Sequence, residues 1–367
     1  MISIDNVYMQ RALELAKRGL GYTNPNPLVG AVIVKEGRII GEGYHKYLGG
    51  PHAEIDAFQN ATEDVSGSTM YVTLEPCSHY GRTPPCAEAI VKNKISKVVI
   101  AITDPNPLVA GRGIQVLREH GIEVITGVLK DEAMKINEIF IKYISTKEPF
   151  CIMKTAMTLD GKIATASGES RWITGEASRT LVHQLRHRVS GIMVGIGTII
   201  KDDPSLTTRL DGMEGIDPMR IIIDSKARIP LNAKVLSIKS KAKTVIVTTE
   251  LADPKKLQAL KAKNTKIIVT PLKDHKVDLP YLTKELGKMG VDSILLEGGS
   301  ELNFGAIESS IVDKVIAFVA PKIIGGKLSK TPVGGLGIDH LSKALVLDDL
   351  NVSIVGEDIM IEGYPRR

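Results

Sequence analysis

Four residues in the first half of the chain have the types and spacing of a catalytic zinc centre. His52 and Glu54 form a His-x-Glu pair, and Cys77 and Cys86 follow further along. Zinc can bind one imidazole and two thiolates and keep a fourth position open for water, which is the arrangement of a catalytic site. Bound zinc lowers the pKa of water to about 7, and Glu54 is placed to carry the proton to a leaving amine. The pattern predicts hydrolytic deamination, with a structural zinc site or no metal as the alternatives.

The spacing of the two cysteines departs from the general signature of zinc deaminases, H-x-E followed by P-C-x-x-C. Here eight residues, 78–85, separate Cys77 from Cys86. This insertion is expected to bring His79 and Arg82 beside the metal. Because a guanidinium presents paired donors, Arg82 is expected to bind a phosphate group.

The second half contains no dinucleotide-binding fingerprint of the G-x-G-x-x-G type. The nearest segment, residues 195–198, lacks the third glycine and a following acidic residue. Residues 297–300, Glu-Gly-Gly-Ser, instead follow an apolar run and precede helical sequence. Glycines in such a turn let backbone amides approach a phosphate at a helix N-terminus. The alternative is that this segment forms a tight turn and binds no ligand.

Alternation of apolar strands with short helices predicts that both halves are α/β. In the first half we expect a largely parallel sheet, with strands at 28–34, 38–40, 70–74, 98–102 and 124–128 and helices at 53–61, 86–94, 113–120 and 131–144. Gly37 between the first two strands indicates a hairpin. In the second half we expect strands at 151–157, 191–194, 220–223, 244–247, 266–269, 293–296 and 315–319, helices at 176–188 and 282–289, and antiparallel strands over 344–361.

Length and composition are those of a globular protein with two domains. The 367 residues exceed one average domain, and 43% are hydrophobic. Pro149 discourages continuation of the helix before it, which puts the boundary near residue 147. The sequence shows neither a signal peptide nor an 18-residue apolar stretch, and three cysteines do not suggest a disulfide framework. We therefore expect a cytoplasmic protein, with Cys151 as a buried thiol.

The net charge of +5 is dispersed, and the chain has one Trp and five Phe. These features count against a competing class, a deaminase that flips a base out of a nucleic acid and uses its second unit for recognition. They suit an anionic small molecule.

Several segments together resemble a known family. They are residues 24–30 (NPNPLVG), 52–54 (HAE) and 76–86 (PCSHYGRTPPC), followed in the second half by 154–164, 168–174, 202–207 and 320–326. The chain resembles the bifunctional riboflavin-biosynthesis deaminase/reductases, the RibD family, over both halves. The resemblance implies a cytidine-deaminase-like α/β sandwich over residues 1–147 and a dihydrofolate-reductase-like α/β domain over residues 148–367.

In that family the first domain converts 2,5-diamino-6-(5-phosphoribosylamino)pyrimidin-4(3H)-one to 5-amino-6-(5-phosphoribosylamino)uracil, and the second reduces the ribosyl group to ribityl with NADPH. The resemblance implies zinc ligation by His52, Cys77 and Cys86, proton transfer by Glu54, and deaminase substrate contacts from Asn26, His45, His79, Arg82 and Asp104. It places the reductase substrate against Lys154, Ser170, Arg186, Leu206, Arg209 and Glu297. It places the cofactor against Ala156, Trp172, Thr198, Asp202, Ser225, Gly299, Ser300, Glu301, Leu302, Asn303, Phe304 and Gly305.

Some questions stay open at this level. Arg186 and Arg209 suit a phosphate clamp, but Arg186 also fits the solvated face of a basic helix. The acid of the reduction is undecided among Lys154, Asp202 and Glu297. Selectivity for NADPH is undecided too, with Ser225, Lys226 and Arg228 as candidate contacts to its 2′-phosphate. We expect only small-molecule ligands, with no nucleic acid and no membrane, and a homo-oligomer. An alternative hypothesis is that the second unit has no activity and only supports the deaminase unit. Its Gly-Gly turns and its paired arginines count against this hypothesis.

Overall fold

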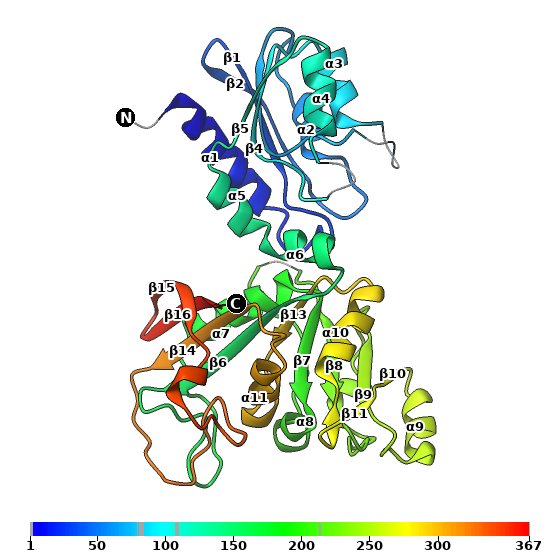
Figure 1. The fold of residues 1–367 in the computed structure, drawn as a ribbon, viewed down its shortest axis with the longest axis vertical. Helices are drawn as coiled ribbons and strands as arrows, with labels where there is room; N and C mark the ends of the chain where they lie inside the picture. The colour runs from blue at the N-terminus through cyan, green and yellow to red at the C-terminus, as the bar shows by residue number, and fades with distance from the viewer. Residues whose placement is uncertain (1–2, 79, 81–83, 107–109, 213, 367) are drawn as a thin grey trace. The chain divides into compact units, whose positions relative to one another are not determined.

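The computed structural model describes residues 3–78, 80, 84–106, 110–212 and 214–366. The chain divides into two units, Met1–Lys147 and Glu148–Arg367, each built around its own sheet (Figure 1). No helix among the described residues has the length and apolar character needed to cross a membrane.

The first unit holds a five-stranded sheet with the order β2-β1-β3-β4-β5. The strands β3, β4 and β5 are parallel, whereas β1 pairs antiparallel with both β2 and β3. The hairpin expected around Gly37 is confirmed, because β1 and β2 pair antiparallel across it. The expectation of a largely parallel sheet is wrong at β1, which also pairs antiparallel with β3, so two of the four strand pairs are antiparallel. The bounds are β1 Gly30–Lys35, β2 Arg38–Tyr44, β3 Thr69–Leu74, β4 Lys97–Ile102 and β5 Glu123–Thr126.

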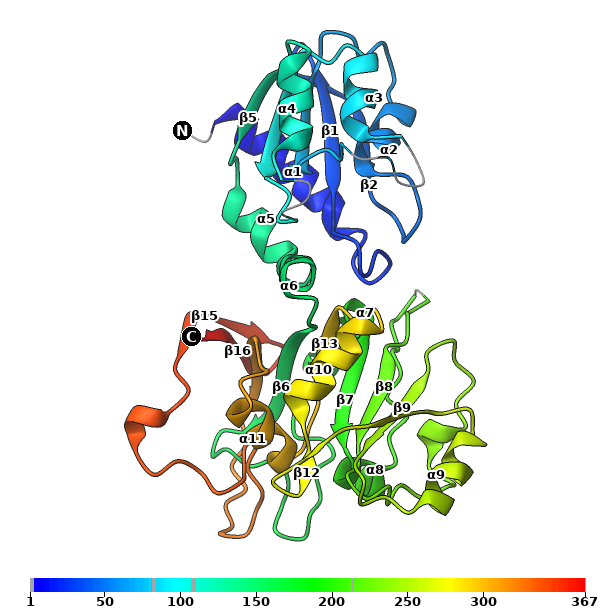
Figure 2. The same cartoon turned by 45° about the vertical axis from the view of Figure 1, so that its right-hand side comes forward.

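Alternate residues of these strands point to opposite faces, and both faces are covered by helices (Figure 2). Ile33, Val72 and Ile100 pack in one apolar cluster with α2, α3 and α4, while Val32 and Val99 pack on the other side with α1 and α5. The helices are α1 Ile4–Lys17, α2 Ala53–Gln59, α3 Cys86–Lys92, α4 Arg112–Glu119, α5 Lys130–Ile136 and α6 Glu138–Thr146.

Two helical features of this unit differ from the expectation. The sequence analysis assigned no helix to the first residues, yet the Ser3 side chain caps the N-terminus of α1 by accepting the Asn6 amide hydrogen. The single helix expected over 131–144 is two helices, α5 and α6, that meet at Asn137. The buried Asn137 side chain bonds both the amide and the carbonyl of Leu28, a contact distant in sequence.

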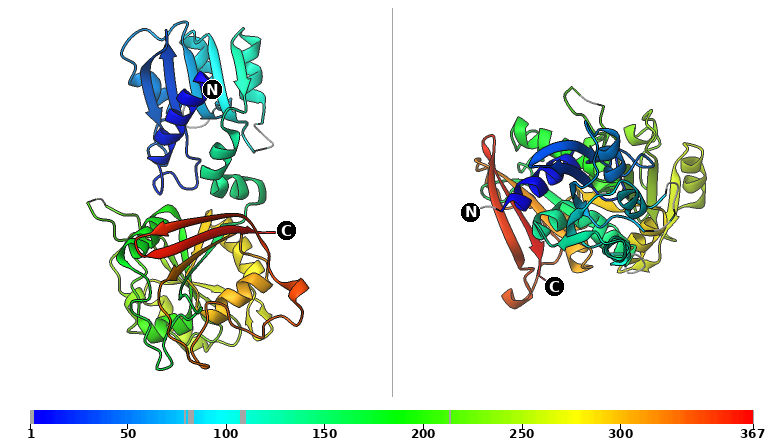
Figure 3. Two further views of the ribbon diagram at one scale, coloured as in Figure 1. Left: turned by 90° about the vertical axis from the view of Figure 1, so that its left-hand side faces the viewer. Right: turned by 90° about the horizontal axis from the view of Figure 1, so that it is seen from above.

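The second unit holds a nine-stranded sheet with the order β10-β9-β8-β7-β13-β6-β14-β16-β15. The pairs from β10 to β14 are parallel, and the C-terminal strands β16 and β15 are antiparallel, as expected for the end of the chain (Figure 3). The bounds are β6 Phe150–Thr158, β7 Gly191–Gly195, β8 Met219–Ile223, β9 Thr244–Thr248, β10 Lys266–Val269, β13 Ser293–Leu296, β14 Lys314–Ala320, β15 Leu347–Val355 and β16 Asp358–Pro365. A small hairpin pairs β11 Leu272–Lys273 with β12 Lys276–Val277.

Two apolar clusters lie on opposite faces of this sheet. One includes residues of α10 and α11 together with Cys151, which is fully buried and confirms the expected core thiol. The other includes residues of α8 and α9, two helices that the sequence analysis did not predict. The helices are α7 Glu176–Arg188, α8 Ile196–Asp202, α9 Pro254–Lys261, α10 Leu279–Lys288 and α11 Ser300–Glu308, with 3-10 turns η1 Lys234–Leu236 and η2 Leu341–Lys343.

Candidate active sites

The three expected zinc ligands converge in the first unit. His52 occupies the N-cap position of α2, Cys86 is the first residue of α3, and Cys77 follows the end of β3. The Nδ1 atom of His52 lies 3.2 Å from the Sγ of Cys86 and 3.5 Å from the Sγ of Cys77, and the three atoms lie within 4.8 Å of one another. Neighbouring ligand atoms of a tetrahedral zinc with these donors lie about 3.5 Å apart, so the residues fit the ion.

The local charges favour a thiolate at this position. The Cys77 sulfur accepts the backbone N–H of Cys86 at 3.3 Å. Hydrogen bonding from Cys86 and from His52 lowers the pKa of Cys77 to about 4, although burial opposes this shift. The hydrogen bond with Cys77, together with burial, raises the pKa of Cys86 above its usual range. Cys77 is therefore ionised at neutral pH, which is the form that binds zinc.

Glu54 lies in the first turn of α2 beside these ligands. Its side chain is 3% exposed. Burial, reinforced by the nearby Cys77 sulfur, raises the pKa of Glu54 to about 7. A carboxyl group with such a pKa can both accept and release a proton near neutral pH, as a general acid and base must.

His45 lies next to the expected ligand His52, and Asn26 contacts His45. The Nδ1 atom of His45 is 2.9 Å from the carbonyl of Pro51, and its Nε2 atom is 3.2 Å from the amide nitrogen of Asn26. The two contacts are compatible when Nδ1 carries the hydrogen, because Nε2 then accepts from the amide of Asn26. The rings of His45 and His52 meet edge to face, with centroids 5.8 Å apart.

A buried carboxylate that the sequence analysis missed holds the loop of Asp104. Glu75 accepts the backbone N–H groups of Asp104, Gly111, Gly113 and Ile114 at 2.9–3.3 Å. It ties this loop and the start of α4 to the segment that carries Cys77. The sequence contains one signal for this role: Glu75 is an acidic residue at the end of a buried strand, directly before Pro76 and Cys77. His79 and Arg82 lie outside the described residues.

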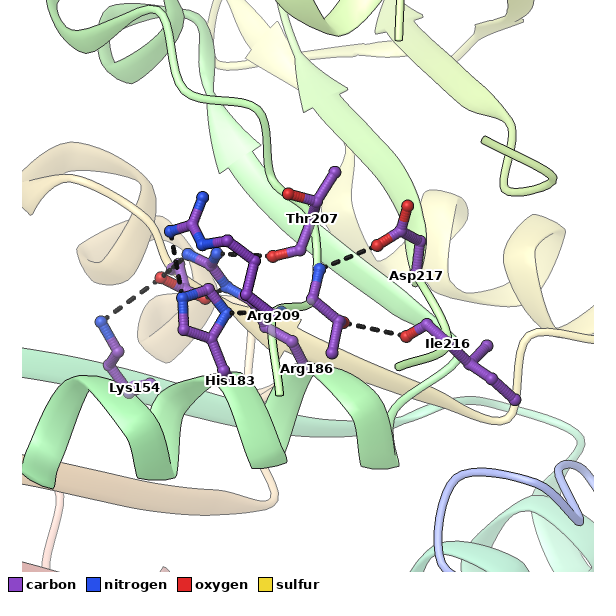
Figure 4. A network of polar contacts seen from close by, with 9 residues as sticks. Lys154, His183, Arg186, Thr207, Arg209, Ile216 and Asp217 are labelled. Carbon is purple, nitrogen blue, oxygen red and sulfur yellow. Dashed lines mark hydrogen bonds and ion pairs between the residues drawn. The ribbon is translucent and has the colours of Figure 1, made fainter. Parts of the chain in front are cut away.

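The candidate reductase site is organised around Glu297, which directly follows β13. Its carboxylate receives two hydrogen bonds from Arg186, at 2.7 and 3.0 Å, and lies 3.3 Å from the Nζ of Lys154 (Figure 4). Burial alone would raise the pKa of Glu297, but Arg186 and Lys154 lower it to about 2. The solvated-face interpretation of Arg186 is wrong, because its side chain is 15% exposed and paired.

A second arginine, Arg209, contacts a histidine instead of a carboxylate. Its guanidinium Nη2 lies 3.1 Å from the Nε2 of His183, on α7. The two arginines therefore have different kinds of partner: Arg186 pairs with the carboxylate of Glu297, and Arg209 contacts the imidazole of His183. The side chain of Leu206, a third expected substrate contact, is 3% exposed and packed in the core, so only its backbone can face a ligand. Ser170 is half-buried in the loop after β6.

The residues expected to bind the cofactor lie at the carboxyl ends of adjacent parallel strands. Thr198 and Asp202 are on α8 after β7, Ser225 follows β8, and Ala156 is near the end of β6. Ligands of parallel α/β sheets bind at this edge. Lys226 and Arg228 after β8 are exposed, and Trp172 is 62% exposed with the Arg179 guanidinium 4.7 Å from its ring centroid.

The segment from Gly299 to Gly305, expected to line the cofactor, is the N-cap and first turns of α11. Gly299 faces open space, and a side chain at Gly298 would clash with Asn303 at 2.5 Å. Asn303 is 1% exposed, and its Oδ1 atom has no hydrogen-bond partner among the described residues. The backbone N–H groups at this open, glycine-containing helix N-terminus fit a phosphate group of a dinucleotide.

The fold and the two sites define a two-domain α/β enzyme of the zinc deaminase and reductase class. Residues 2–102 match the cytidine and deoxycytidylate deaminase zinc-binding region, and residues 149–361 match the RibD C-terminal domain. The chain belongs to the RibD family, the bifunctional deaminase/reductases of riboflavin biosynthesis. The α/β class expected for both units, the zinc-binding deaminase domain and the NADPH-dependent kind of reductase domain are confirmed.

Similar proteins match nearly the whole chain. The riboflavin biosynthesis protein RibD of Actinobacillus pleuropneumoniae is 50% identical over 355 residues, covering 97% of this chain and 94% of that protein. The RibD of Escherichia coli is 37% identical over 371 residues, covering 97% and 98%. The solved structure of Acinetobacter baumannii RibD, form 1, is 39% identical with a TM-score of 0.89 and covers 99% of both chains. A Thermotoga maritima structure described as a diaminohydroxyphosphoribosylaminopyrimidine deaminase/5-amino-6-(5-phosphoribosylamino)uracil reductase is 40% identical, with a TM-score of 0.86 and 99% coverage of both chains.

Proposed function

We propose that this chain catalyses two consecutive steps on one phosphoribosyl-pyrimidine. Residues 1–147 deaminate 2,5-diamino-6-(5-phosphoribosylamino)pyrimidin-4(3H)-one, and residues 148–367 reduce the ribosyl group of the resulting aminouracil with NADPH. The convergence of His52, Cys77, Cys86 and Glu54 is the observation that carries the first step. The Lys154–Glu297–Arg186 network at the edge of the second sheet supports the other.

In the deaminase unit, His52, Cys77 and Cys86 would hold zinc, and zinc supplies the activation of water at neutral pH. Glu54 takes the proton from the attacking water and delivers it to the departing amine, since its buried carboxyl group lies beside the ligands. Asn26 and His45 bind the pyrimidine edge next to His52. Asp104 binds the same substrate from the loop that Glu75 holds.

In the reductase unit, the nicotinamide supplies a hydride to C1′ of the ribose. The ring oxygen must take up a proton as its bond to C1′ breaks, so one residue must carry a proton at neutral pH. Glu297 cannot do so, because its pKa is about 2. We assign the acid to Lys154, whose ammonium group Glu297 holds at 3.3 Å. We assign Asp202, the remaining candidate for the acid, to the cofactor site, because it lies on α8 with Thr198.

Mass spectrometry of the product, with and without NADPH, tests both steps. The diaminopyrimidine ribotide should exchange an amino group for oxygen without NADPH and should gain two further hydrogens with it. Glu54→Gln should keep stoichiometric zinc and release no ammonia, while still oxidising NADPH on the deaminated substrate. Ammonia release at the wild-type rate by this variant would exclude Glu54 as the proton carrier.

Three further properties stay predictions. They are a cytoplasmic location, the lack of nucleic-acid binding and a homo-oligomeric state. Gel filtration with light scattering measures the last, and titration with RNA at low salt measures the second.

A further inference from the structure

The two arginines at the candidate reductase site differ in how their charge is balanced. Arg186 forms a bidentate pair with the Glu297 carboxylate, and its remaining Nη1 atom donates to the carbonyl of Thr207 at 3.0 Å. The charge of Arg186 is therefore offset within the protein. Arg209 is exposed, and the partner of its guanidinium is the imidazole of His183.

His183 can hold Arg209 only as a neutral ring. Its Nδ1 atom faces the backbone N–H of Arg209 at 3.3 Å and its Nε2 atom faces the guanidinium at 3.1 Å, so both neighbours are donors (Figure 4). A neutral imidazole has one acceptor nitrogen, and it accepts from the guanidinium when the ring hydrogen is on Nδ1. A protonated imidazole has no acceptor and would oppose both contacts. Burial, together with Arg186 and Arg209, lowers the pKa of His183 to about 4 against the weaker opposing effects of Glu297 and the Thr207 carbonyl.

A neutral acceptor orients a guanidinium without cancelling its charge, which a carboxylate would do. Lys154, Arg186 and Arg209 are the cations of this network, and Glu297 and Asp217 are its anions among the described residues (Figure 4). With His183 neutral, the network keeps one net positive charge, and Arg209 is the cation whose side-chain partner is uncharged. The phosphate group of a ribose 5-phosphate carries nearly two negative charges at neutral pH, so it suits the uncompensated charge of Arg209.

We propose that His183 is a positioning residue, a neutral acceptor that orients the Arg209 guanidinium and leaves its charge available to the substrate phosphate. This inference rests on the proposed reductase function and refines it. Arg209, and not Arg186, is then the principal phosphate contact of the second unit. Arg186 instead fixes Glu297, which in turn holds Lys154.

Two variants of His183 that differ only in charge test this proposal. His183→Gln keeps a neutral acceptor, whereas His183→Glu places a carboxylate against Arg209. For the phosphorylated aminouracil, the KM of the Glu variant should exceed that of the Gln variant by about tenfold, the loss expected when a charge-assisted phosphate contact is neutralised. The KM for NADPH and the value of kcat should differ little between the two.

Gln184 provides a matched control on the same helix. It is exposed, and Gln184→Glu makes the same change of charge one residue away. This control should leave the KM for the phosphorylated substrate unchanged. If the Glu variant of His183 fails to fold, His183→Leu replaces it: Leu accepts no hydrogen bond, so its KM should exceed that of the Gln variant.

The dephosphorylated riboside separates a phosphate effect from a general one. On this substrate the Gln and Glu variants should have equal kcat/KM. Equal KM values for the phosphorylated substrate, or a difference that persists on the riboside, would overturn the role of His183. A wild-type protein that oxidises no NADPH with the aminouracil would overturn the proposed reductase function itself.

Discussion

Replacing Glu297 by Gln is expected to destabilise the second unit by about 3 kcal/mol at pH 7. The Glu297 side chain is 12% exposed and pairs with two cations, Arg186 at 2.7 Å and Lys154 at 3.3 Å. Gln keeps the shape but removes the charge, which leaves both cations in a largely buried site. Breaking a buried pair in this way is costly because the remaining charge is desolvated without compensation.

The magnitude follows from the pKa of Glu297, which falls from 4.5 to about 2 on folding. At about 1.4 kcal/mol per pKa unit, the carboxylate contributes roughly 3 kcal/mol to the free energy of unfolding. Since the pKa is lowered in the folded state, this contribution is complete above pH 4.5 and is lost as the pH falls toward 2. At pH 3 the contribution should be less than half of its value at pH 7.

Urea unfolding at pH 7 and pH 3 measures this dependence. The chain has a single Trp, Trp172, and it lies in the second unit, so its fluorescence reports the transition of that unit. Glu285→Gln is the matched control, because Glu285 pairs with Lys288 at 2.7 Å on the surface and should cost about 0.5 kcal/mol or less. A loss below about 1 kcal/mol for Glu297→Gln at pH 7, or an equal loss at both pH values, would refute the reasoning.

Three further perturbations have defined outcomes. Cys86→Ser should lower zinc content and abolish ammonia release while NADPH oxidation on the deaminated substrate persists, and loss of both activities would contradict two separate sites. Glu75→Gln should lower the stability of the first unit by about 3 kcal/mol, because four backbone N–H groups lose a charged acceptor; an unchanged melting temperature would count against this role. Gly30→Ala should cost about 3 kcal/mol, since the added methyl group would lie 1.9 Å from the carbonyl oxygen of Ala12 on α1, and a wild-type melting curve would show that the helix can move away at little cost.

The chemistry of the first unit could be predicted from local sequence. His52 and Glu54 share the start of one helix, and Cys86 opens another, so short-range spacing already places ligands and proton carrier near helix ends. Strand and helix periodicity likewise predicted most elements of both sheets. The hairpin of β1 and β2 was predicted, whereas the antiparallel pairing of β1 with β3 and the helices α1, α8 and α9 were not.

The chain alone therefore determined the kind of chemistry: the ligand types, the zinc-deaminase pattern and the two-unit α/β organisation are properties of residue identity and local spacing. Only the tertiary structure decided which charges are offset. Arg186 and Glu297 are 111 positions apart, and His183 and Arg209 are 26 apart, so no local pattern distinguishes the two arginines. The parallel strands β6, β7 and β13 end at one edge of the sheet and bring these side chains together. In the folded chain Arg186 pairs with a carboxylate, whereas Arg209 contacts a neutral imidazole. Because their partners differ, we infer different roles for the two arginines.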